Sequence, residues 1–260
     1  MADEAPAADD ALTDDTVLGG RVRLLQPRRG HRVGHDAILL AAATAAAPGQ
    51  HAVELGAGVG AAGIALAVRL PGLAVTLVEI DSRLAALAAQ NIRRNDLAAR
   101  LRAVALDIAA PDRDFAAAGL PAGSAAAVLM NPPFNDAARH NRSPDAGRRL
   151  AHVAHRGLAP WVGCAARLLA PHGVLTLIWR ADGLAEVLGA LGAFGAVTIL
   201  PVHPRPDAPA NRILLRAVRA SRTPLALLPG LMLADADGRP TPQAEVVLRH
   251  GAALPLQPLP

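Results

Sequence analysis

Short apolar runs alternate with longer amphipathic segments along most of the chain. The runs are nearly continuous, which is typical of strands buried on both faces of a parallel sheet, and the segments between them are long enough for helices. We expect strands at residues 51–55, 74–80, 101–106, 125–130, 174–179, 196–202 and 212–218. The alternation predicts an α/β fold, a doubly wound, mostly parallel, seven-stranded Rossmann-like sheet whose last strand is antiparallel.

The two ends of the chain depart from this alternation. Residues 1–15 are acidic and alanine-rich, so we expect a disordered tail, and they lack the apolar core of a signal peptide. A helix is expected from Gly34, with Asp36 as its candidate N-cap. From Ser221 onward, prolines interrupt the chain repeatedly, which indicates an irregular extension rather than further sheet–helix units.

The pattern therefore divides the chain into three parts. The tail (1–15) precedes one sheet domain that includes an N-terminal helical cap (16–220), and a C-terminal extension (221–260) is expected to pack on that domain. Within the extension we expect a small strand pair, residues 231–233 and 245–248, on the flank of the sheet.

Composition narrows the class of protein. All 26 basic residues are arginine, the net charge is +4 and the pI is near 10.9, which favours a polyanionic partner modestly. The one cysteine, Cys164, excludes an internal disulfide and a cysteine metal cluster, and it fits a reducing compartment. No apolar run reaches the roughly 18–20 residues that a membrane span needs. We therefore expect a cytoplasmic protein with no metal site and no membrane association.

Three glycines alternate directly after the first strand of the predicted sheet, at positions 56, 58 and 60. Glycine adopts positive φ freely and lets a ligand approach the backbone, so this turn is a candidate nucleotide-binding site. A nicotinamide dinucleotide is the obvious competing ligand. Position 61 is alanine, however, and the spacing is therefore not a clean G-x-G-x-x-G.

Acidic residues lie at the ends of the next two strands. Glu79 ends the second strand and is placed to accept hydrogen bonds from both hydroxyls of a ribose. Asp107 ends the third strand, where its carboxylate can accept from an adenine amino group. Either acid alone is compatible with an ordinary solvated strand end. Because parallel strands present their carboxyl ends at one edge of the sheet, both acids are expected near the glycine turn.

The fourth strand leads into Asn131-Pro132-Pro133-Phe134. Two prolines remove two backbone donors, so the carbonyls of Asn131 and Pro132 stay free to accept hydrogen bonds, and Phe134 offers a flat apolar face. Together these groups suit a planar molecule that carries an exocyclic NH2. A Pro-Pro turn with a core phenylalanine is the structural alternative, and the neighbouring glycine turn favours the functional interpretation.

At these residues the chain resembles class I S-adenosylmethionine-dependent methyltransferases, and its Asn-Pro-Pro-Phe tetrapeptide resembles that of the amino-methyltransferase branch. A closer resemblance is to the bacterial tRNA1(Val) (adenine-N6)-methyltransferase family, from about Leu12 to Leu256. The segments that carry it are Thr13-Asp14-Asp15, Gly19-Gly20, Gln26-Pro27 and Gly30 to Ala41. The resemblance implies S-adenosylmethionine as cofactor and N6-methylation of an adenine in a tRNA anticodon loop.

The resemblance also implies a role for each motif residue. The methionine part of the cofactor is approached by Gly56, Gly58 and Gly60, and its ammonium group is contacted indirectly by Glu54. The ribose is held by Glu79, and the adenine by Asp107 with Ile108. The target base is held by Asn131, Pro132, Pro133 and Phe134.

A basic stretch follows the tetrapeptide. It comprises Arg139, His140, Arg142, Arg148, Arg149, His152, His155 and Arg156. An arginine-rich surface here would contact the phosphates of tRNA or another structured RNA, and a solvated arginine-rich loop is the alternative.

Other functions remain open from the sequence. Ribosomal-RNA guanine-N2 and protein-glutamine N5 methyltransferases also carry Asn-Pro-Pro-aromatic motifs. An RNA-binding module that has lost catalysis is an alternative of another class, and a nicotinamide-dependent oxidoreductase is a more distant one. Binding of S-adenosylmethionine would favour either methyltransferase over the inactive RNA-binding module and the oxidoreductase.

Overall fold

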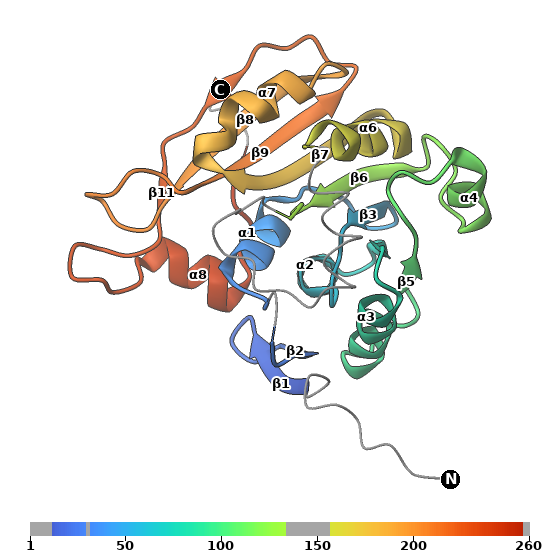
Figure 1. The fold of residues 1–260 in the computed structure, drawn as a ribbon. Helices are drawn as coiled ribbons and strands as arrows, with labels where there is room; N and C mark the ends of the chain where they lie inside the picture. The colour runs from blue at the N-terminus through green and yellow to red at the C-terminus, as the bar shows by residue number, and fades with distance from the viewer. Residues whose placement is uncertain (1–11, 30–31, 134–156, 257–260) are drawn as a thin grey trace.

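One sheet forms the centre of the protein (Figure 1). The computed structural model describes residues 12–29, 32–133 and 157–256, and within these residues the sheet has nine strands. They are β3 (His51–Leu55), β4 (Ala74–Glu79), β5 (Leu101–Ala105), β6 (Ala125–Met130), β7 (Leu169–Arg180), β8 (Phe194–His203), β9 (Arg212–Arg219), β10 (Ala226–Leu227) and β11 (Leu231–Met232).

The strand order is β10-β8-β9-β7-β6-β3-β4-β5, with β11 also paired to β8. All neighbours are parallel except β9, which runs antiparallel to both β7 and β8. The predicted mostly parallel Rossmann-like sheet with an antiparallel last main strand is thereby confirmed, and two short strands, β10 and β11, extend it beyond the seven strands predicted. The chain moves outward from β3 to β5 and then returns to the other side of β3 with β6. This reversal creates a switch point, the place where such sheets bind ligands.

Helices cover both faces of the sheet. They are α1 (His35–Ala43), α2 (Ala61–Arg69), α3 (Ser82–Arg94), α4 (Asp112–Ala117), α6 (Ala159–Leu168), α7 (Leu184–Ala190), α8 (Pro242–His250) and a 3-10 turn at Ala181–Gly183. No helix among the described residues is long and apolar enough to cross a membrane.

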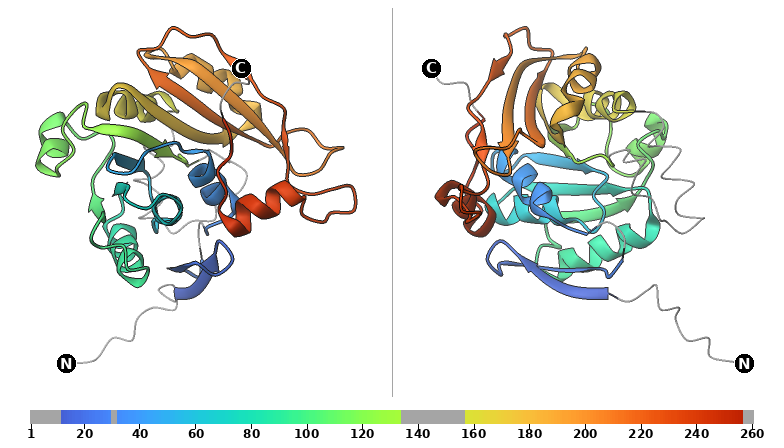
Figure 2. Two further views of the ribbon diagram at one scale, coloured as in Figure 1. Left: turned by 180° about the vertical axis from the view of Figure 1, so that it is seen from behind. Right: turned by 60° about the vertical axis from the view of Figure 1, so that its left-hand side comes forward.

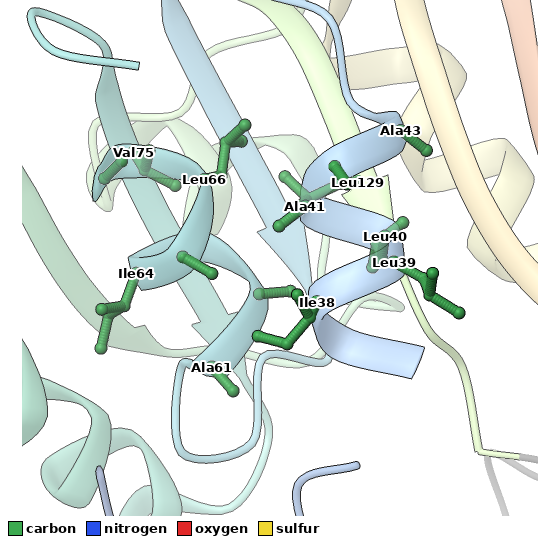
Figure 3. Close-up of a cluster of buried hydrophobic side chains, with 14 of the residues drawn as sticks. Ile38, Leu39, Leu40, Ala41, Ala43, Ala61, Ile64, Leu66, Val75 and Leu129 are labelled. Carbon is green, nitrogen blue, oxygen red and sulfur yellow. The ribbon is translucent and has the colours of Figure 1, made fainter. Parts of the chain in front are cut away.

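Successive strand residues point to opposite faces and fill two separate cores. In β6, Leu129 joins the core beneath α1, α2 and α3, while Val128 joins the core beneath α4, α6 and α7. Figure 3 shows the first core, in which Ala41 of α1, Leu66 of α2 and Leu129 of β6 belong to one cluster. The continuous apolar strands of the sequence follow from this burial on both faces.

An N-terminal hairpin, β1 (Leu12–Val17) and β2 (Val22–Pro27), lies outside the sheet beside α3 (Figure 2). Residues 12–15, which we expected in the disordered tail, therefore form a strand, and residues 1–11 lie outside the described residues. Asp14 accepts from Arg94 of α3 at 2.5 Å, and this hydrogen bond lowers the pKa of Asp14. Ion pairs hold the polar side chain of Asp14 in β1, while Val22 and Leu24 of β2 are buried in the core beneath α1, α2 and α3.

The C-terminal extension differs from its prediction. Residues 231–232 do form a short strand, but residues 245–248 lie inside α8 and not in a strand. The helix has an N-cap at Thr241, whose side chain accepts from Ala244 N, and it ends at Gly251 in the left-handed conformation. These start and stop signals outweigh the β-branched pair at 246–247.

The beginning of α1 also differs in detail. Gly34 is the N-cap of α1, and Asp36 lies in the first turn, where its carboxylate does not cap the helix. The carboxylate accepts instead from Arg212 Nε of β9 at 2.9 Å. This ion pair connects α1 to the first residue of β9. Arg212 lies opposite Arg180, the last residue of β7, so the connection is at the carboxyl end of β7.

Candidate functional site

The carboxyl ends of four parallel strands meet at one edge of the sheet. Leu55 of β3 lies opposite Val78 of β4 and Met130 of β6, and Glu79 lies opposite Ala105 of β5. The glycine turn, Glu79, Asp107 and Asn131 follow directly at these ends. The structure therefore brings the predicted site residues that it describes to the same edge, on both sides of the switch point.

The glycine turn closes over β4. The amides of Gly56 and Ala57 donate to Val78 O at 2.9 and 3.0 Å. A Cβ on Gly56 would lie 2.8 Å from the Trp161 ring of α6, so packing requires this glycine. Gly58 has φ +55°, and among the described atoms a Cβ there would meet nothing within 4 Å. The backbone at Gly58 thus faces open space, which suits the close approach of a ligand.

Glu79 holds this turn to the end of β4. Its side chain is buried, and one carboxylate oxygen accepts from Gly58 N at 2.7 Å while the other accepts from Asp81 N at 3.0 Å. A carboxylate has about four lone-pair directions, so each oxygen can accept one more donor. Glu79 can therefore position the turn and still accept hydrogen bonds from ligand hydroxyls.

Glu54 is a second buried acid, placed in β3 just before the turn. Its exposed fraction is 4%, and one carboxyl oxygen accepts from Gly63 N of α2 at 2.7 Å. The pKa of Glu54 is raised to about 8, mainly by burial and to a smaller extent by the charge of Glu79, while the Gly63 hydrogen bond opposes the rise. At neutral pH this group is therefore mostly a neutral carboxylic acid, ready to ionise beside a cation.

The loop after β5 is held by an arginine that sequence reasoning missed. Asp107 accepts from Ala109 N at 2.8 Å, and Ile108 is buried. Arg167 of α6 donates to the carbonyls of Ile108 and Ala110, at 3.4 and 3.1 Å.

Two further contacts fix the same guanidinium. It donates to Asp112 Oδ1 at 2.8 Å and lies 4.5 Å above the centre of the Phe115 ring. The signal that could have found Arg167 is a lone arginine in the last turn of an otherwise apolar helix.

Asn131 directly follows β6 at the switch point. Among the described residues, its Oδ1 is buried and accepts no hydrogen bond, although buried polar atoms are almost always paired. Pro132 is buried and Pro133 half-buried. An acceptor without a donor, desolvated at the site edge, suits a ligand N–H. Phe134 and the basic stretch 139–156 lie outside the described residues.

The family model of the methyltransferase small domain matches residues 32–198, from α1 to β8. The chain belongs to the methyltransferase small-domain family. The class I methyltransferase resemblance of the sequence is thereby confirmed. The protein is an S-adenosylmethionine-dependent methyltransferase, with S-adenosylmethionine as its cofactor.

Individual relatives are similar to this chain over different shares of its length. The tRNA1(Val) (adenine(37)-N6)-methyltransferase of Bacteroides fragilis is 27% identical over 71% of this chain and 76% of its own length. The Porphyromonas gingivalis enzyme of the same name is 31% identical over 60% of this chain and 61% of its own. The 23S rRNA (uracil(1939)-C(5))-methyltransferase RlmD of Acidithiobacillus ferrooxidans is 38% identical over 41% of this chain, and this chain spans only 23% of that enzyme.

One solved structure is similar over almost its whole length. The crystal structure of protein Atu636 from Agrobacterium tumefaciens, described as a predicted O-methyltransferase, has a TM-score of 0.71 and 31% identity. The similarity covers 84% of this chain and 98% of Atu636. Pyrococcus horikoshii TYW2, at 14% identity and a TM-score of 0.53, shares the fold alone.

The site residues fit the cofactor of a methyltransferase in three respects. Open space faces the Gly58 backbone, the Glu79 carboxylate keeps accepting capacity, and the Glu54 carboxyl can ionise. Within the described parts of the chain, no group of three His, Cys, Asp or Glu side chains is arranged to hold a metal ion.

Proposed function

We propose that this methyltransferase methylates the exocyclic N6 of an adenine in RNA, with a tRNA anticodon loop as the substrate. The observation that carries the proposal is the buried Oδ1 of Asn131, which has no hydrogen-bond partner among the described residues and is followed by two prolines at the edge where the glycine turn lies. The names of the Bacteroides and Porphyromonas relatives support adenine N6 as the acceptor.

In this proposal residues at the carboxyl ends of β3, β4 and β5 would hold the cofactor. Its methionine part would be approached by Gly56, Gly58 and Gly60, and Glu54 would balance its ammonium charge from beneath the turn. The two acids at the strand ends would bind the nucleoside: Glu79 would accept from the ribose hydroxyls, and Asp107 with the Ile108 backbone would hold the adenine. When bound, S-adenosylmethionine supplies an electrophilic methyl group.

The target amine needs positioning more than a base. The lone pair of an adenine amino group is delocalised into the ring, and acceptors for both N–H groups draw the nitrogen toward tetrahedral geometry. We propose that Asn131 Oδ1 and the Pro132 carbonyl are those acceptors, and that Phe134, which lies outside the described residues, stacks on the ring. The methylated nitrogen is acidic and loses its extra proton readily, so catalysis rests on orientation and electrostatics.

The position of the site at the strand ends and the positive charge of the chain support RNA as the partner. A base within a duplex cannot reach a strand-end site, so the target base is flipped or comes from a loop. Arg148, Arg149 and their basic neighbours in 139–156 are proposed to contact phosphates, which predicts binding that weakens steeply with salt. A tRNA substrate also places the enzyme in the cytoplasm.

An oxygen acceptor is the second candidate, because the relative Atu636 is described as a predicted O-methyltransferase. A hydroxyl has a single proton to donate, whereas an amino group has two N–H donors that match two neighbouring acceptors. The Asn131–Pro132 pair therefore favours an amino group. The same pair would also accept the amide of a protein glutamine or the N2 of a guanine.

The class of acceptor is tested by transferring labelled methyl from S-adenosylmethionine into total RNA and into total protein of a bacterial extract. The proposal predicts label that ribonuclease releases and protease does not, with transfer falling as salt rises. Label released by protease, or base-labile label in small molecules, would overturn the RNA substrate while keeping the methyltransferase class.

A further inference from the structure

Two asparagines of α3 dock the N-terminal hairpin by imitating a neighbouring strand. Asn91 Oδ1 accepts from Leu25 N at 2.8 Å, and its Nδ2 donates to Leu25 O at 2.9 Å. One helical turn later, Asn95 Oδ1 accepts from Arg23 N at 2.9 Å, and its Nδ2 donates to Arg23 O at 2.8 Å. Each amide thus pairs with both backbone groups of one β2 residue, as a ladder residue would.

The two asparagines differ in what else they bind. Asn95 ends α3, and its remaining N–H donates to Asn91 O at 2.8 Å within the same helix. Asn91 lies inside the helix and is fully buried, and its second N–H donates to Val59 O at 3.0 Å. Val59 belongs to the glycine turn, between Gly58 and Gly60. A buried asparagine in a helix interior is unfavourable unless its polar atoms are satisfied, and these three bonds satisfy them.

The glycine turn is therefore held from two sides around its open position. Glu79 accepts from the amide of Gly58, and Asn91 donates to the carbonyl of Val59, the next residue. Together the bonds fix the peptide units on both sides of the Gly58–Val59 bond. One of the two holders, Asn91, is at the same time bonded to β2 of the hairpin.

We propose that Asn91 is a positioning residue that couples the N-terminal hairpin to the cofactor site. Hairpin docking orients the amide of Asn91, the amide orients the Val59 carbonyl, and the glycine turn is thereby preset for the cofactor. Coupling of this kind is reciprocal, so cofactor binding stabilises the docked hairpin by the same factor. The inference rests on the cofactor site described under the proposed function.

The chain offers a matched pair of variants. Asn91→Ala and Asn95→Ala each remove two bonds to β2, but only Asn91→Ala removes the bond to the glycine turn. We expect both variants to unfold at lower urea concentration than the wild type. We expect Asn91→Ala to bind S-adenosylmethionine about tenfold more weakly in calorimetric titration, for one lost hydrogen bond and a loosened turn, and Asn95→Ala, which loosens only the hairpin, to lose affinity by a clearly smaller factor. In turnover, its KM for the cofactor should rise while kcat stays within about twofold.

Equal weakening by both variants, or unchanged affinity in Asn91→Ala, would overturn the coupling. Hydrogen exchange on the wild-type protein tests it without a variant, in case Asn91→Ala does not fold. Adding S-adenosylmethionine should slow exchange at residues 22–27 as well as at the glycine turn. Protection of the turn without protection of 22–27 would refute the coupling, whereas absence of any binding by the wild type would refute the cofactor site itself.

Discussion

The buried carboxyl of Glu54 makes the stability of this enzyme depend on pH, and Glu54→Gln should remove that dependence. Burial raises its pKa in the folded state to about 8, from an ordinary value of 4.5. The folded state therefore holds the proton more tightly than the unfolded chain. The stability from this group is complete below pH 4.5 and is lost as the pH rises through about 8. At about 1.4 kcal/mol per pKa unit, the loss between pH 4 and pH 9 is on the order of 5 kcal/mol.

Glutamine at this position keeps the acceptor for Gly63 N but cannot ionise. Urea unfolding at several pH values between 5 and 9 measures the effect as the free energy of unfolding of each protein. The stability of Glu54→Gln relative to the wild type should increase by roughly 4 kcal/mol across this range. Glu245→Gln, which changes an acid on the surface of α8, serves as the control and should keep the wild-type profile. Parallel profiles for the wild type and Glu54→Gln would refute the reasoning.

Three further predictions concern the same edge of the sheet. Gly58→Ala places a methyl group in the open space at φ +55°; it should cost about 1 kcal/mol of stability but weaken S-adenosylmethionine binding more than tenfold in calorimetry, and unchanged affinity would contradict the site. Gly63→Ala should instead lower the free energy of unfolding by roughly 2–3 kcal/mol, because its Cβ would lie 2.6 Å from Glu54 Oε2. A urea midpoint equal to that of the wild type would argue against this packing. Arg167→Met removes the donor to the carbonyls of the loop after β5 and should raise KM for the cofactor about fivefold with kcat nearly unchanged. The KM of Arg167→Lys should lie between those of the wild type and Arg167→Met. A loss in kcat alone would argue against a role at the cofactor.

The sheet could be predicted from sequence because its strands are apolar on both faces and bounded by turn residues. The hairpin could not, since β1 alternates exposed and half-buried residues and is held by side chains from a distant helix. In α8 the β-branched pair at 246–247 favoured a strand, whereas the Thr241 cap and Gly251 decided for a helix. Local β propensity gave way to capping.

Some residues of the site could be predicted from the sequence and others could not. The meeting of the glycine turn with Glu79 follows from a general rule, that parallel strands present their carboxyl ends at one edge. Arg167 and Asn91 could not be assigned from the sequence, where both look like ordinary helix residues. Their hydrogen-bond partners lie 57 and 66 residues away in sequence. Both act on backbone carbonyls, which no sequence motif records.

We propose that this enzyme transfers a methyl group to adenine N6 and that Asn131 positions the amine. The most direct measurement is nucleoside analysis of tRNA after reaction with labelled S-adenosylmethionine, for the wild type and Asn131→Ala, alongside the cofactor affinity of each. We predict N6-methyladenosine with the wild type and none with Asn131→Ala, while both bind the cofactor equally. N2-methylguanosine, label in protein only, or an active Asn131→Ala enzyme would contradict the account.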